Sequence, residues 1–283
     1  MGETTVTKEE SKSRGAGIAK RTWEFFIHGW GTYIITAVSL VVFFWVWDLI
    51  SGGVTSSIIL PSPLSVGKAL LDVPTMSRFL PNFWTTLQSM FAGFGIGAGA
   101  GLLLGFLCII SPLFRRSIQP YIVFFQAIPK IALVPLLFVW FGLGMSSKIY
   151  LAGMQSFFPV FVNTALGLTL LPEAEERLMY SLGANRFQRF RMLQVPNALP
   201  LIFAGIKTAL TYAFISVIVG EFLGGSTGLG SMITAFDEAN RTDRTFAVIV
   251  ILSLLSLVIF YGIEYLGRKL VFWDKRKENM PSL

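Results

Sequence analysis

Six long apolar runs constrain the fold of this chain more than any other feature of its sequence. Each run has roughly the 20 apolar residues that an α-helix needs to cross the hydrocarbon core of a bilayer. Charged residues make up only 14% of the chain, against about 25% in an ordinary soluble domain. The sequence therefore predicts an all-α membrane protein with six transmembrane helices, at residues 32–50, 85–110, 120–142, 149–171, 200–223 and 245–266.

The third run is the weakest of the six because it contains Lys130 and two prolines, Pro129 and Pro135. Pro129 is expected to break the helix near the middle of the run. An ionisable group within a membrane costs about 2.5–3.5 kcal/mol on insertion scales, so it is a candidate functional group. Lys130 could attract an anionic solute, or it could be structural. Other polar residues could line the same path or pack between helices: Gln126, Gln155, Asn163, Tyr212 and Ser216.

The lysine and arginine residues predict the orientation of the chain in the membrane. With the N-terminus inside, 16 of these 23 residues lie in cytoplasmic segments, and Lys130 and Lys207 lie within spans. Since basic residues concentrate on the cytoplasmic side, both termini are expected to be cytoplasmic. This distribution accounts for the net charge of +7, so the basic charge does not indicate a protein that binds nucleic acid. The five basic residues of the outer segments are Lys68, Arg78, Lys148, Arg241 and Arg244.

A glycine appears at every fourth position in the second run. Residues spaced in this way share one helix face, and glycine allows a neighbouring backbone to approach closely. The stripe predicts close helix packing, either within the chain or at a subunit interface. Its members are Gly93, Gly97, Gly101 and Gly105.

The longest predicted cytoplasmic loop, residues 172–199, has the pattern of two short helices. The stretch EAEERLMYSL is a good helix former, and Gly183 is a natural C-terminal stop. Asn185, with Gln188 three residues later, predicts a capping box at the start of a second helix. We expect Pro196 to end that helix. Its predicted faces are Phe187, Phe190 and Leu193 on one side and Arg186 and Arg189 on another.

Several stretches resemble binding-protein-dependent ABC importer permeases of the nitrate/sulfonate/taurine class. The cytoplasmic signature of these permeases is E-A-A-x3-G-x9-I-x-L-P. Here Gly183 is followed by nine residues and then by LQVP, whereas Arg177, Leu178 and Met179 replace the E-A-A triplet. The stretches LPSP, AIPKIALVPLLFVWFGLGMSSK and VGEFLGGSTGLG also match the class. The resemblance covers about residues 30 to 270.

This resemblance implies a type I, MetI-like permease fold in a bacterial plasma (inner) membrane. The 172–199 loop would form coupling helices that dock on separate ATPase subunits, whose closure switches the spans between outward- and inward-facing states. The residues implied in this coupling are Glu176, Arg177, Leu182, Gly183, Ala184, Arg186, Phe187 and Pro196. Glu221, Gly228 and Gly230 would hold the outer loop or an outer gate.

The resemblance also implies the partners. They are two ABC ATPase subunits, a second copy of the permease in a homodimer, and an extracytoplasmic binding protein that delivers a small, anionic solute. The chain has no G-x4-G-K-[ST] phosphate-binding loop. We therefore expect it to be non-catalytic and to bind no cofactor, with ATP and Mg²⁺ held by the ATPase subunits. The expected domains are a basic tail at 1–24, a permease domain at 25–270 and a C-terminal tail at 271–283.

Two other functions fit a polytopic membrane protein. The membrane coupling subunit of an energy-coupling-factor vitamin transporter also docks on ATPases, but its paired Ala-Arg-Gly-type motifs are absent from this sequence. An intramembrane protease or lipid phosphatase needs convergent His, Asp or Ser groups. The single histidine, His28, precedes the first run, and the runs hold no carboxylate pair at depth, so an enzyme is less favoured. The single cysteine, Cys108, lies in an apolar run and excludes a disulfide framework or a thiol metal cluster.

Overall fold

The computed structural model describes residues 30–53, 56 and 58–273, and all the regular structure in this part is helical. The predicted tail at 1–24 and most of that at 271–283 lie outside the described residues. The chain divides into two compact units, Met1–Val66 and Gly67–Leu283. In the described residues, five helices are long and apolar enough to cross a membrane, or six if one bent pair counts as a single span. The prediction of a six-span helical protein is therefore confirmed.

The first unit contains the first span. Helix α2, Trp30–Gly53, covers the predicted run at 32–50. Trp47 Nε1 donates a hydrogen bond to the Pro61 carbonyl at 3.0 Å, which ties the end of α2 to the following segment. Helix α3, Pro63–Asp72, begins there and continues into the second unit.

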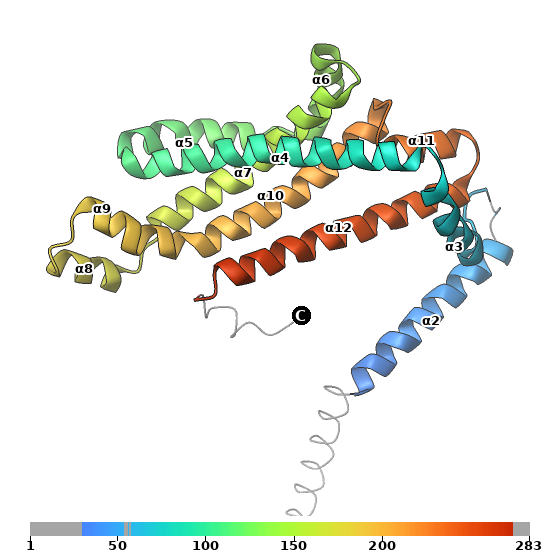
Figure 1. Ribbon diagram of the computed structural model, residues 1–283, viewed down its shortest axis with the longest axis horizontal. Coiled ribbons are helices and arrows are strands. Elements are labelled where there is room, and N and C mark those ends of the chain that lie inside the picture. The colour runs from blue at the N-terminus through green and yellow to red at the C-terminus, as the bar shows by residue number, and fades with distance from the viewer. Residues whose placement is uncertain (1–29, 54–55, 57, 274–283) are drawn as a thin grey trace, which may run out of the picture. The chain divides into compact units, whose positions relative to one another are not determined.

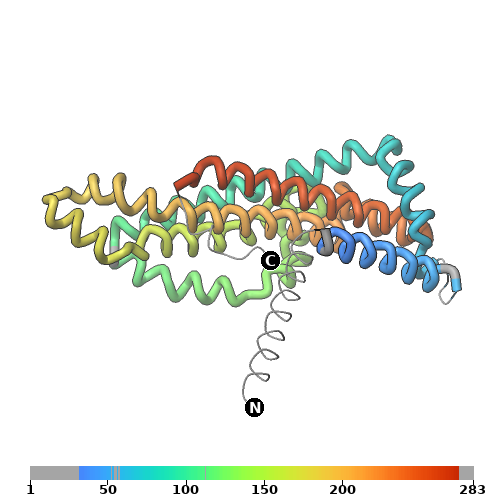
Figure 2. The backbone as a smooth tube through the Cα atoms, turned by 90° about the horizontal axis from the view of Figure 1, so that it is seen from below, coloured from blue at the N-terminus to red at the C-terminus, as the bar shows by residue number. Residues whose placement is uncertain are grey.

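Four long helices form the bundle of the second unit: α4 (Phe79–Ile110), α7 (Met145–Thr169), α10 (Val195–Gly224) and α12 (Thr242–Leu270). Helix α4 lies along α7, and α7 lies along α10 (Figure 1). The short helices α8 (Glu173–Ser181) and α9 (Arg186–Arg189) lie at one end, and α11 (Leu229–Glu238) lies at the other. In the perpendicular view, α8 and α9 extend beyond the ends of the long helices (Figure 2).

The glycine stripe of α4 lies directly against α7. A Cβ atom at Gly97 would collide with the Gly153 backbone, and one at Gly93 would lie 2.6 Å from the Ile149 carbonyl oxygen. A Cβ at Gly105 would lie 2.6 Å from Thr164 Cγ2. By contrast, a Cβ at Gly99 has no neighbour within 4 Å. The stripe is therefore an intrachain packing surface, one of the two possibilities that the sequence left open.

The largest core cluster lies where α3, α4, α10, α11 and α12 meet. It includes the fully buried residues Val73, Met90, Val217, Leu229 and Val248. Because Val73 and Leu229 belong to the segments that connect the spans, this core fixes those segments as well as the long helices.

The third predicted span, residues 120–142, is not a single straight helix. Helix α5, Pro112–Ala127, ends before Pro129, a 3₁₀ turn spans Lys130–Leu133, and α6 spans Val134–Phe141. The two halves are bent by 76°. A residue before proline avoids the helical region, and Ile128 is extended at ψ 128°. The break that the sequence predicted at Pro129 is confirmed.

Pro196 does not end the second loop helix, so this prediction was wrong. A π-helical turn, Phe190–Gln194, joins α9 to α10, and the Val195 N–H donates to the Phe190 carbonyl. This wider turn places Pro196 at the start of α10, where its missing N–H is tolerated. The loop therefore continues without a helical break into the fifth span.

Candidate functional site

The first candidate site is the helical hairpin of α8 and α9. Its turn is fixed by Gly183, which has φ +70°, a conformation that glycine adopts without steric cost. The Gly183 N–H donates to the Tyr180 carbonyl and the Ala184 N–H donates to the Met179 carbonyl. These two bonds form a Schellman motif, which satisfies carbonyls at the end of α8. The predicted stop at Gly183 is confirmed.

The capping box predicted at the start of the second helix is also confirmed. The Asn185 side chain accepts a hydrogen bond from the Gln188 N–H at 2.8 Å. The Gln188 side chain accepts one from the Asn185 N–H at 2.9 Å. Both ends of the turn are therefore held by hydrogen bonds that its own sequence encodes.

Polar contacts fix the hairpin as one body. Arg189 forms an ion pair with Glu176 at 2.8 Å, and its guanidinium lies 4.0 Å from the centre of the Tyr180 ring. Asn197 Nδ2 donates to the Glu175 carboxylate at 2.9 Å, which links α8 to the start of α10. Arg177 pairs with Glu173 within α8, but this pair is exposed and contributes little. The contacts between helices therefore hold α8 against α9 and the start of α10.

The hairpin exposes large apolar side chains at this end of the bundle. Phe187 is 67% exposed, whereas Leu193 is 6% exposed and Phe190 packs against Phe106. Phe187 and Phe190 line the same surface beside Phe106, as predicted. Leu193 is buried and is not part of that surface, because the π turn changes the helical phase between Phe190 and Leu193. The exposed apolar residues are Leu178, Leu182, Phe187 and Met192.

The second candidate site lies at the opposite end of the bundle. We call it the loop-anchoring cluster and define it as Asn82, Thr86, Lys148 and Glu221. Thr86 Oγ1 donates to the Glu221 carboxylate, whose oxygens lie 2.9 and 3.0 Å away. Glu221 also accepts from the Gly230 N–H at 2.9 Å. The structure thus confirms that Glu221 holds the GGSTGLG loop.

Lys148 completes this cluster, although the sequence placed it in an outer segment. It lies in the first turn of α7, and the side chains of Lys148 and Glu221 are both 0% exposed. Its Nζ lies 3.9 Å from Glu221 Oε1 and donates to the carbonyl of Thr227. The sequence counted Lys148 among the basic residues of an outer segment but did not predict its burial or its contact with Glu221. A charge this deep needs a partner, and the sequence does not show which residue supplies it.

The backbone of the loop is held at two further points. The Gly228 N–H donates to Asn82 Oδ1 at 2.7 Å, and the Leu229 N–H donates to Thr86 Oγ1 at 2.9 Å. Gly228 has φ +107°, and a Cβ there would collide with the Glu221 carboxylate. The cluster therefore fixes the start of α11 against α4, α7 and α10.

The predicted path residues lie at the bend between α5 and α6 and on helices α7 and α10. Lys130 Nζ donates to the Gln126 carbonyl at 3.3 Å and lies 4.5 Å from the centre of the Phe158 ring, at the bend between α5 and α6. Asn163 donates to the Pro159 carbonyl within α7. Ser216 is buried, Gln155 is half-buried and Tyr212 is exposed.

Sequence reasoning also missed an ion-pair group between the fifth and sixth spans. Lys207 on α10 lies 2.7 Å from Glu264 on α12, and its Nζ lies 3.8 Å from the centre of the Phe260 ring. Arg268 lies 2.6 Å from the same glutamate. The i,i+4 spacing of Glu264 and Arg268 was readable in the sequence, but the contact across helices was not.

Comparison with known proteins identifies the bundle. Residues 97–272 match the family of binding-protein-dependent transport system inner membrane components. The chain belongs to this family. This permease is 34% identical to the formylaminopyrimidine transport permease protein ThiX of Halalkalibacterium halodurans over 82% of its own length and 92% of the relative. It is 27% identical to the taurine transport system permease protein TauC of Escherichia coli, over 89% and 93%.

The fold comparison agrees with this assignment. An inward-facing structure of the MetNI methionine ABC transporter superposes with a TM-score of 0.59 and 21% identity. The superposition covers 69% of this chain and 97% of the MetNI chain, so it shows the MetI-like fold. The chain is thus a multi-pass membrane permease subunit of an ABC importer, and relatives named for aliphatic sulfonates and for taurine are among the proteins that it resembles. The energy-coupling-factor alternative is not favoured. The partners of such a permease are of two kinds, an ATPase and a solute-binding protein.

Proposed function

We propose that the α8–α9 hairpin couples this permease to ATP hydrolysis by docking on a separate ATPase subunit. The observation that carries the proposal is a braced helical hairpin at one end of the bundle that exposes Leu178, Leu182 and Phe187. An amphipathic helix of this kind binds by placing its apolar residues in a groove of a partner. The uninterrupted helix from Arg186 into α10 gives that partner a rigid connection to the fifth span.

The coupling role extends to the residues that shape the hairpin. Glu176 acts through Arg189, Gly183 and Ala184 form the turn, and Pro196 begins α10. Arg177 and Arg186 are exposed and offer charge to the partner. This chain is non-catalytic in the proposal, and two ATPase subunits bind ATP and Mg²⁺.

The remaining parts of the proposal concern assembly and orientation. Two copies of this chain form a homodimer whose permease domains span residues 25–270, with the 172–199 loop and both termini in the cytoplasm. The positions of three basic residues that were predicted to lie outside support this orientation. Arg78, Arg241 and Arg244 lie at the α11 end of the bundle, opposite the hairpin. An extracytoplasmic binding protein delivers the solute at that end. There Glu221, Gly228 and Gly230 fix the outer gate.

The transported solute is small and anionic in this proposal. Its relatives are named for taurine and for formylaminopyrimidine, which supports a small organic solute. Lys130 supports a negative charge on the solute, because it is a half-buried cation at the break in a span. Gln126, Gln155, Asn163, Tyr212 and Ser216 are the polar residues proposed to lie along the path.

The test of coupling is co-purification. We expect a tagged chain, expressed with its ATPase subunit, to retain that subunit through affinity purification. Leu182→Asp and Phe187→Asp should release the ATPase while the permease stays folded, because both side chains are exposed in the isolated chain. Leu143→Asp is the matched control, an exposed apolar residue outside the hairpin. Equal recovery of the ATPase with all four proteins would refute docking through the hairpin.

A further inference from the structure

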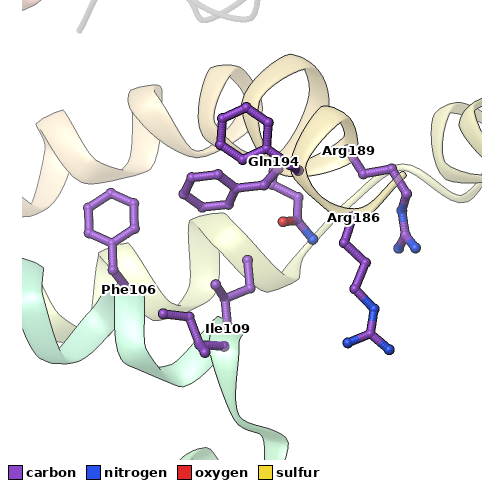
Figure 3. Close-up of a pocket in the computed structure, with 8 residues that line it drawn as sticks. Phe106, Ile109, Arg186, Arg189 and Gln194 are labelled. Atoms are coloured by element: carbon purple, nitrogen blue, oxygen red, sulfur yellow. The ribbon is translucent and has the colours of Figure 1, made fainter. Parts of the chain in front are cut away.

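A cleft of about 660 Å³ lies between the last turns of α4 and the segment that begins at α9 (Figure 3). Helix α4 contributes Phe106, Ile109 and Ile110 to its lining, and the α9 segment contributes Phe187 and two arginines. In Figure 3 the side chains of Arg186 and Arg189 extend to the same side of α9. The volume is within the roughly 300–1,000 Å³ typical of sites for small molecules.

The apolar wall of the cleft lies where a membrane span ends. Ile110 is the last residue of α4 and is 75% exposed. The following helix carries two exposed arginines, Arg115 and Arg116, in its first turns. An apolar helix face that changes abruptly to exposed arginines marks the boundary between acyl chains and headgroups. The cleft therefore opens at the depth where a phospholipid carries its phosphate.

The charge at this end of the bundle favours an anion. The three glutamates of α8 are engaged: Glu173 with Arg177, Glu175 with Asn197 and Glu176 with Arg189. Among the described residues, Arg186 forms no ion pair, and neither do Arg115 and Arg116. Arg186 thus places an uncompensated guanidinium group on the lining of the cleft, and Arg115 and Arg116 add two more shortly after α4 ends at Ile110, a lining residue. Arginine binds phosphate through two parallel hydrogen bonds.

We propose that this cleft binds an anionic phospholipid of the surrounding leaflet. The phosphate contacts Arg186, and an acyl chain lies along Phe106 and Ile109. Basic pockets beside membrane spans recognise anionic headgroups in this way. Lipid binding at this site requires that the chain lies in a membrane but does not require an ATPase. Only the assignment of the lipid to the cytoplasmic leaflet rests on the proposed function. A bound lipid would brace the hairpin against α4.

The test measures lipid binding to the purified permease alone, in an uncharged detergent. Native mass spectrometry with dioleoyl phosphatidylglycerol and dioleoyl phosphatidylcholine gives an apparent dissociation constant for each. We expect phosphatidylglycerol to bind more tightly than phosphatidylcholine. Arg186→Gln should weaken the binding of phosphatidylglycerol about fivefold, which is the effect of about one basic residue beside an anionic headgroup. Arg186→Lys should retain most of the binding. Arg177→Gln, the same change on an exposed arginine outside the cleft, should have no effect.

One further variant and one further probe make the result decisive. Ile109→Trp should fill the cleft and reduce the binding of phosphatidylglycerol, with its melting temperature as the check on folding. Glycerol phosphate at millimolar concentration should not displace the lipid, because it lacks the acyl chain. Equal binding of the two lipids, or unchanged binding by Arg186→Gln, would overturn the proposal. Displacement by glycerol phosphate would also overturn it and would identify a site for a free phosphate ester. Loss of ATPase binding by Arg186→Gln with unchanged lipid binding would assign the cleft to the coupling surface instead.

Discussion

Replacement of Lys148 by methionine should destabilise the bundle through the charge that it leaves behind. Lys148 Nζ lies 3.9 Å from Glu221 Oε1, and both side chains are 0% exposed. At this distance, two unit charges attract by about 4 kcal/mol at an effective dielectric constant of about 20. In Lys148→Met, Glu221 keeps only the neutral donors Thr86 and Gly230. Removal of one partner of a buried ion pair typically costs about 3–5 kcal/mol, and we expect a loss in that range.

A double-mutant cycle isolates the interaction between the two charges. The free energy of unfolding is measured in mixed detergent micelles for Lys148→Met, Glu221→Gln and the double variant. Because the double variant buries no unpaired charge, its loss should be smaller than the sum of the single losses by about 2–4 kcal/mol. The control cycle is Lys207→Met with Glu264→Gln. That pair is more exposed, and Arg268 remains bound to Glu264, so its coupling should be smaller. Losses at Lys148 and Glu221 that add to within about 0.5 kcal/mol would refute the buried pair.

Three further predictions concern packing, topology and the path. Gly97→Ala should cost about 1–3 kcal/mol of unfolding free energy by overpacking against Gly153. Gly99→Ala, where a Cβ has no neighbour within 4 Å, should instead stabilise the protein by up to about 1 kcal/mol. Equal effects of the two variants would contradict the packing of α4 on α7. Cysteines placed at Ser181 and Ser226, both exposed, should react with an impermeant maleimide from opposite sides of the membrane; labelling of both from one side would exclude the topology. If Lys130 attracts the solute, Lys130→Met should abolish uptake and Lys130→Arg should retain part of it. The melting temperature of both variants should be unchanged. Normal uptake by Lys130→Met would refute this role for Lys130.

Features encoded by neighbouring residues were predictable from the sequence. Hydropathy located the spans, the Gly183 and Asn185–Gln188 signals located the hairpin turn, and the four-residue glycine spacing identified a packing face. These features depend on local backbone preference or on helical periodicity. The close match of predicted and observed turns follows from that local origin.

Features that depend on distant contacts were missed. Lys148 and Glu221 are 73 positions apart, and only the antiparallel packing of α7 on α10 brings them together. The continuation through Pro196 depends on a π turn that packs Phe190 against Phe106, across 84 positions. Hydropathy likewise identified the apolar content of the third run but not the 76° angle between its halves, because tertiary packing sets that angle.

The most direct test of coupling through the hairpin is the ratio of solute uptake to ATP hydrolysis in proteoliposomes that contain the permease, its ATPase and its binding protein. The informative pair of variants is Gly183→Val and Gly183→Asn, because φ is +70° at this position and asparagine tolerates that conformation far better than valine. We predict that Gly183→Val hydrolyses ATP with little uptake, and that Gly183→Asn retains a ratio close to that of the unmodified chain. An unchanged ratio in Gly183→Val would contradict the conclusion that this hairpin transmits the ATPase cycle to the membrane spans.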